Sequence, residues 1–142
     1  MTNDLMRLFF SILSTAYIAG IFLLADSPVV SDLAPFNPYS LLHIPLYGIL
    51  TLLITFSFAP FKSKRNNAIN AKNPINLHFL IPGIIALIVA IADEIHQSFI
   101  PTRDASITDV LLDAVGIVLA VVLILRIYKN QKAPNTRYRI YA

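Results

Sequence analysis

The side chains best suited to chemistry in this sequence are carboxylates and imidazoles placed close to polar amides and hydroxyls. They fall into three groups along the chain: His43 with Tyr47, Asp93 with Glu94 and Gln97, and Asp109 with Asp113. Carboxylates that lie close together in a low-dielectric site cannot all ionise, so one of them keeps a proton. Such a site contains both an acid and a base, which hydrolysis or group transfer requires.

Several other kinds of site are excluded or not favoured. The chain has no cysteine, which excludes disulfides, thiolate nucleophiles and zinc–thiolate sites. It also has no His-Glu-x-x-His motif and no nucleophile elbow. A divalent metal bound by Asp93, Glu94, Asp109 and His43 is compatible with these residue types. We do not favour a metal, because these residues show no fixed metal-ligand spacing.

Long apolar stretches carry these residues and predict transmembrane helices. The chain of 142 residues is 56% hydrophobic and only 13% charged, about half the charge of a soluble domain. Each stretch supplies the roughly 20 helical residues that cross a bilayer. The four predicted spans cover about residues 5–25, 40–59, 77–99 and 107–127. The sequence therefore predicts a single all-α domain over residues 1–142, a four-helix, multi-pass transmembrane bundle with a short outer turn between the third and fourth helices.

The first span has a basic start, as a cleaved signal peptide has, but its apolar stretch is longer than the usual 7–15 residues. No clear cleavage site follows it, so we favour a retained helix. The formal net charge is +3. The basic residues fall in short blocks between the apolar stretches, which indicates membrane lipids and not nucleic acid as the partner.

The loop charges predict the orientation, because cytoplasmic loops carry the excess of Lys and Arg. Ten of the eleven basic residues lie before span one, between spans two and three, or at and after the end of span four. Arg103 is the only basic residue in the two other loops. Both termini are therefore predicted to be cytoplasmic, with residues 128–142 as a basic cytoplasmic tail. The acidic residues, except Asp4, map to the outer side.

The depth and spacing of the polar residues predict an outer-facing pocket. Asp93 lies 16 residues into span three, which is roughly 24 Å along a helix. An ionised group in the hydrocarbon costs about 2.5–3.5 kcal/mol, so such residues face the bundle interior and mark a site by default. Ser106, Asp109, Asp113 and Gly116 form one helical stripe, and Gly116 allows a neighbouring helix to approach closely.

The segment from Asp93 to Ser106 resembles the signature of VanZ-like membrane proteins. The pattern is Asp-Glu-x-x-Gln, an Arg after a Pro, a Ser and an Asp, then an Asn or Asp and a Gly. The matching residues are Asp93, Glu94, Gln97, Pro101, Arg103, Ser106, Asp109, Asp113 and Gly116. His43 and Tyr47 resemble the second patch of the family. An Asp-Lys pair usually precedes that His, whereas this chain has Tyr39 and Ser40 there.

The resemblance implies a protein of the cell envelope, since founding members are linked to resistance to glycopeptide antibiotics, chiefly teicoplanin. We expect action at the outer face of the bacterial cytoplasmic (inner) membrane on a lipid-linked envelope precursor. The predicted catalytic residues are Asp93, Glu94, Asp109 and His43. The predicted substrate-binding residues are Gln97, Arg103, Ser106, Asp113 and Tyr47, with Arg103 suited to a phosphate or carboxylate.

The residues leave alternatives open. The same pocket would serve a non-catalytic protein that binds a lipid or precursor, or an accessory protein of envelope polysaccharide assembly, so we make no prediction of enzymatic activity. The acids could also form a structural network through Arg103, and Asp109 could cap its helix. A transporter is disfavoured, because the cytoplasmic half of the spans has no deep ionisable residue to complete a path.

Overall fold

The computed structural model describes residues 3–28, 40–58, 77–101, 103 and 105–132. All regular secondary structure within these residues is helical. The helices are α1 (Asn3–Leu24), α3 (His43–Phe58), α4 (Leu77–Gln97) and α5 (Ile107–Lys132). The prediction of an all-α fold with four apolar helices is therefore confirmed.

Three of the helices, α1, α4 and α5, are long and apolar enough to cross a membrane. The helix α3 has only 16 residues, which is roughly 24 Å at 1.5 Å per residue. It begins three residues later than its apolar stretch, because Ser40 has a φ of 55° and a right-handed helix excludes positive φ values. The late start makes His43 the first helical residue of α3.

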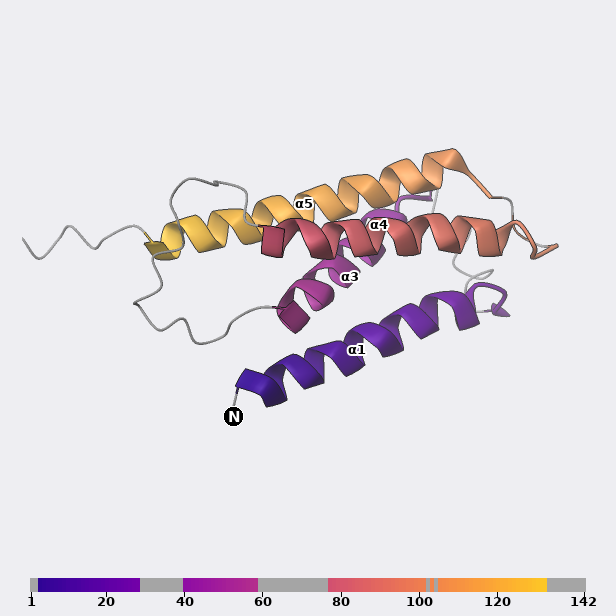
Figure 1. Ribbon diagram of the computed structural model, residues 1–142. Coiled ribbons are helices and arrows are strands. Elements are labelled where there is room, and N and C mark those ends of the chain that lie inside the picture. Colours follow the sequence, from indigo (N-terminus) through magenta and orange to yellow (C-terminus); the bar gives the residue numbers. More distant parts are fainter. Residues whose placement is uncertain (1–2, 29–39, 59–76, 102, 104, 133–142) are drawn as a thin grey trace, which may run out of the picture.

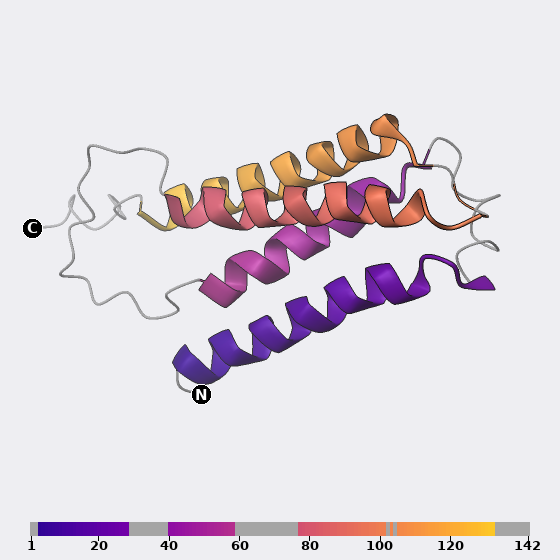
Figure 2. The ribbon, with the colours of Figure 1, turned by 45° about the vertical axis from the view of Figure 1, so that its right-hand side comes forward.

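The helices run up and down in alternation, as in an antiparallel bundle. The starts of α1 and α4 lie at the same end as the finish of α3 and α5, on the left in Figure 1. Figure 2 shows from a second direction that α4 and α5 lie side by side, while α3 crosses between them and α1 at a steeper angle. The opposite end, with Leu24, His43, Gln97 and Ile107, is called the site end below.

The core is centred on α3. Its buried cluster contains Tyr47, Leu50, Ile54, Ala86, Ala90 and Ile117. The helices α3 and α5 come closest at Gly48 and Gly116, where a Cβ added at Gly116 would overlap the carbonyl oxygen of Ile44. The absence of a side chain at Gly116 therefore determines how near α3 lies to α5, as the helical stripe predicts.

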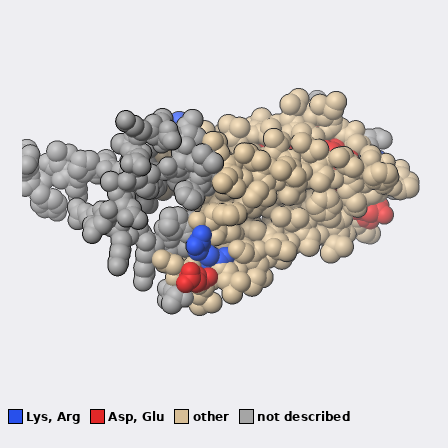
Figure 3. Space-filling view, viewed as in Figure 1, with Lys and Arg blue, Asp and Glu red and all other residues tan. Residues whose placement is uncertain are grey.

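The outer surface of the helices is apolar. Large apolar side chains stand exposed on every helix, and Leu23, Ile107 and Phe99 in the turn after α4 are each at least 80% exposed. On the face seen in Figure 3, charged groups gather mainly towards the two ends, and the wide band between them is uncharged. An apolar surface this extensive fits lipid as its surroundings, so the helices suit insertion into a membrane.

The end opposite the site contains Arg7, which donates hydrogen bonds to the carbonyl oxygens of Ser57 and Phe58. These bonds tie the start of α1 to the finish of α3. Other residues used for the predicted orientation lie outside the described part of the chain: Asp32, Lys62, Lys64, Arg65, Lys72, Asp104, Arg137 and Arg139. The last ten residues of the predicted tail, 133–142, also lie outside it.

Candidate functional site

A buried His–Asp pair joins α3 to α5 at the site end. Nδ1 of His43 lies 2.9 Å from Oδ1 of Asp113, and Nε2 lies 3.7 Å from Oδ2 of Asp109. Asp109 and Asp113 are one helical turn apart on α5, so both face the imidazole. His43 reaches them because it opens α3 just beside the Gly48–Gly116 crossing.

A second set of hydrogen bonds starts at Asp93 on α4. The Tyr47 hydroxyl and the Gln97 amide both donate to Oδ2 of Asp93, at 3.3 and 3.0 Å. The Gln97 carbonyl oxygen accepts in turn from Nη2 of Arg103 at 3.2 Å. A chain of contacts therefore runs from a half-buried guanidinium to a carboxylate that is only 2% exposed.

Glu94 is positioned by the turn between α4 and α5. The backbone N–H of Ser106 donates to Oε2 of Glu94 at 2.7 Å. The Ser106 hydroxyl accepts from the N–H of Thr108 at 3.1 Å, so Ser106 is the N-cap of α5. The Ser106 side chain, which was expected to contact substrate, thus caps α5. The Ser106 backbone N–H holds Glu94, which was expected to be catalytic.

The structure brings all nine candidate residues to the site end. Those that are buried come from three helices: His43, Tyr47, Asp93, Glu94, Gln97, Asp109 and Asp113. Arg103 donates a hydrogen bond to the Gln97 carbonyl oxygen, and among the described residues it forms no ion pair with a carboxylate. In the described part of the chain, the only ion pairs of these acids are with His43.

Several carboxylate oxygens in this cluster lack a hydrogen-bond partner among the described residues. They are Oδ1 of Asp93, Oε1 of Glu94 and Oδ2 of Asp113, and all three are buried. A buried polar atom without a partner is costly. The cluster therefore has unused capacity to accept protons, hydrogen bonds or a cation, which is what acid–base chemistry or ligand binding requires.

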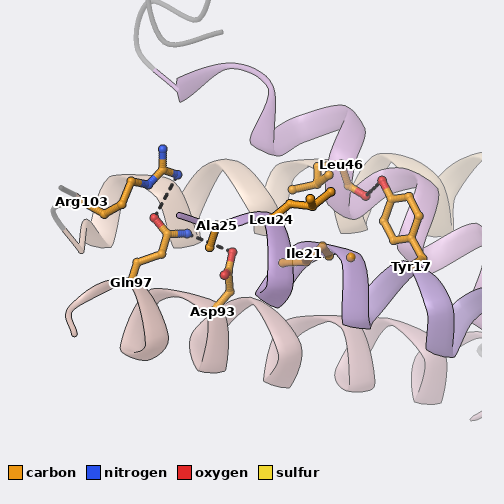
Figure 4. Close-up of a pocket in the computed structure, with 9 residues that line it drawn as sticks. Tyr17, Ile21, Leu24, Ala25, Leu46, Asp93, Gln97 and Arg103 are labelled. Carbon is orange, nitrogen blue, oxygen red and sulfur yellow. Dashed lines mark hydrogen bonds between the residues drawn. The ribbon is translucent and has the colours of Figure 1, made fainter. Parts of the chain in front are cut away.

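A cavity of about 260 Å³ adjoins this cluster, and sequence reasoning missed it. It is lined by Tyr17, Gly20, Ile21, Leu24, Ala25, Leu46, Asp93, Gln97 and Arg103. Figure 4 shows Arg103, Gln97 and Asp93 linked in a row by hydrogen bonds, with Ile21 and Leu24 of α1 farther along the cavity. Tyr17 donates to the carbonyl oxygen of Leu46 at 3.1 Å. No motif in α1 signals this wall, because its residues are ordinary for a transmembrane helix.

The comparison with protein families agrees with these features. The model of the VanZ/LLP1 family matches residues 9–128, which include α3 and α4, most of α1 and α5, and every candidate residue. No curated protein and no solved structure matches the chain. With a match over most of its length and helices that suit a bilayer, the chain is a membrane protein that belongs to the VanZ/LLP1 family.

Proposed function

We propose that this protein acts at the outer face of the bacterial cytoplasmic membrane on the head group of a lipid-linked envelope precursor. We further propose that this action lowers the sensitivity of the cell to glycopeptide antibiotics such as teicoplanin. The supporting observation is the row of hydrogen bonds from Arg103 through Gln97 to Asp93 along one side of the cavity.

The cavity suits an amphiphile. Its walls on α1 are apolar, and a guanidinium lies at its polar end. Arg binds phosphate or carboxylate through a planar fork of N–H donors. At about 260 Å³ the cavity is smaller than ligand pockets, which measure roughly 300–1,000 Å³. We therefore expect it to hold the head group and the first part of the lipid chain, with the remainder in the bilayer.

The orientation with both termini in the cytoplasm is part of the proposal. Ten of the eleven basic residues fall in the segments assigned to the cytoplasm, and positively charged loops remain inside. Arg7 lies at the end of the bundle opposite the carboxylates. This orientation places the site end, and with it the cavity, on the outer side where envelope precursors meet glycopeptides.

The test compares a teicoplanin-sensitive host with and without the protein. We expect the wild-type chain to raise the minimal inhibitory concentration, and Glu94→Gln or Asp109→Asn to remove this increase at unchanged membrane expression. Asp26→Asn is the matched control, because Asp26 is an exposed acid outside the cluster. Unchanged tolerance in both cluster variants, or no effect of the wild type, would overturn the proposal.

Mass spectrometry of the lipid-linked precursors from the same cells separates chemistry from binding. A precursor species that appears with the wild type and disappears with Glu94→Gln supports hydrolysis or group transfer. An unchanged set of precursors, together with teicoplanin tolerance, supports a binding or accessory protein that uses the same cavity.

A further inference from the structure

Side chains of the kinds that bind metal ions converge on one point of the site end from three different helices. His43 of α3, Glu94 of α4 and Asp113 of α5 each offer one ligand atom, and these atoms all lie within 4.8 Å of one another. The three residues are 7%, 6% and 0% exposed. Ligand atoms bound to one ion at about 2.1 Å lie roughly 3–4 Å apart, so only a small side-chain adjustment separates this arrangement from a coordination shell.

Unpaired oxygens in the same residues give a second observation. Oε2 of Glu94 accepts from the Ser106 N–H, and Oδ1 of Asp113 is bonded to His43. The remaining oxygens, Oε1 of Glu94 and Oδ2 of Asp113, are buried and have no hydrogen-bond partner among the described residues. Each carboxylate is thus held by one oxygen and leaves the other available. Glu94 is thus oriented by a hydrogen bond from outside the ligand set, as metal-binding carboxylates are, whereas Asp113 is held by His43 itself.

The charge at this point also calls for a cation. Four carboxylates, those of Asp93, Glu94, Asp109 and Asp113, lie at the site end and are at most 9% exposed. Within the described residues their only ion-pair partner is His43, which is cationic only when it is protonated, so full ionisation of the acids would leave a surplus of at least three negative charges. Protons or a divalent ion must neutralise most of this charge, since isolated buried charges are not tolerated.

We propose that His43, Glu94 and Asp113 bind a divalent cation of the Zn²⁺ or Mn²⁺ class. One imidazole nitrogen with two carboxylate oxygens suits these ions better than Ca²⁺ or Mg²⁺, which prefer oxygen ligands alone. Residue types alone are compatible with a ligand set of Asp93, Glu94, Asp109 and His43. The structure instead brings Asp113 together with His43 and Glu94. The three ligands come from separate helices, which is why no short motif marks the site.

The cation site shares its residues with the proposed function but does not depend on it. His43, Glu94 and Asp113 do not line the cavity, although Glu94 is the chain neighbour of Asp93, which does. Metal binding is measured without antibiotic or lipid. Failure of one proposal is therefore distinguishable from failure of the other.

The test uses the full chain purified in detergent, freed of metal with a chelator and then equilibrated with Zn²⁺ or Mn²⁺. Elemental analysis should find about one tightly bound ion per wild-type chain. Glu94→Gln and His43→Ala should weaken binding roughly tenfold or more, and the matched control Asp26→Asn should bind as the wild type does. The cation should also raise the Tm of the wild type but not that of Glu94→Gln.

Two results would overturn the proposal. One is a wild-type chain that takes up neither ion, in which case protons alone neutralise the cluster. The other is equal binding by the wild type and Glu94→Gln, which would mean that the ion binds elsewhere. Because Gln has nearly the shape of Glu, Glu94→Gln keeps the proposal testable even if His43→Ala fails to fold.

Discussion

Nδ1 of His43 lies 2.9 Å from Oδ1 of Asp113, although the two residues are 70 positions apart in the chain. Among the described residues it is the shortest contact between polar side chains of α3 and α5. It exists because α3 and α5 cross at two glycines, Gly48 and Gly116. The distance between α3 and α5 therefore determines how closely His43 approaches Asp113.

Gly116→Ala should destabilise the protein and disturb the cluster without changing any polar residue. Its Cβ would overlap the carbonyl oxygen of Ile44, a backbone atom that moves only with α3. Overpacking of this kind costs about 1–3 kcal/mol. Thermal unfolding in detergent measures the loss. Gly20→Ala is the control, because a Cβ there has nothing within 4 Å and Ala favours a helix; an equal loss in both variants would refute the role assigned to the crossing.

Tyr47→Phe should lower the stability more than Tyr17→Phe. Both changes remove one hydroxyl and keep the ring, but the Tyr47 hydroxyl donates to a buried carboxyl group and that of Tyr17 to a carbonyl oxygen. A hydrogen bond to a charged group contributes about 1.5–3 kcal/mol, against about 0.5–1.5 kcal/mol for a neutral pair. Chemical denaturation of the two variants side by side checks the order. The opposite order would show that the hydrogen bond from Tyr47 to Asp93 contributes less stability than the one from Tyr17 to Leu46.

Gly20→Phe should block the cavity and leave the carboxylate cluster intact. Gly20 lines the cavity and has open space around its Cα, so a phenyl ring there would occupy the volume assigned to the lipid. We expect the binding of a fluorescent polyprenyl phosphate to weaken roughly tenfold or more, as the loss of a well-packed contact does, while metal content stays unchanged.

Leu23→Phe provides the comparison for that experiment. Leu23 lies on the same helix, is 80% exposed and does not line the cavity. The two variants differ in the position of the ring and not in its chemistry. If polyprenyl phosphate bound equally well to both, the cavity beside α1 would not be where the lipid binds.

Much of the architecture follows from local properties of the sequence. Apolar runs of about 20 residues predict helices that cross a bilayer. All four runs form helices, and three of these, α1, α4 and α5, are long enough to cross. Helical periodicity places Asp109, Asp113 and Gly116 on one face of α5, and all three are buried. Hydropathy and the helical period of 3.6 residues are properties of a single helix. The spans and their polar faces can therefore be predicted without knowing how the helices pack.

The pairing within the site was decided by tertiary structure alone. That His43 bonds to Asp113, that the Ser106 N–H holds Glu94, and that α1 closes one wall of the cavity depend on where separate helices cross. Crossing positions result from side-chain packing along the whole contact, and the overlap expected at Gly116 shows how little space separates α3 from α5. Residue types along the chain therefore identified the polar residues that gather at the site end, whereas their contacts emerged only when the helices were packed together.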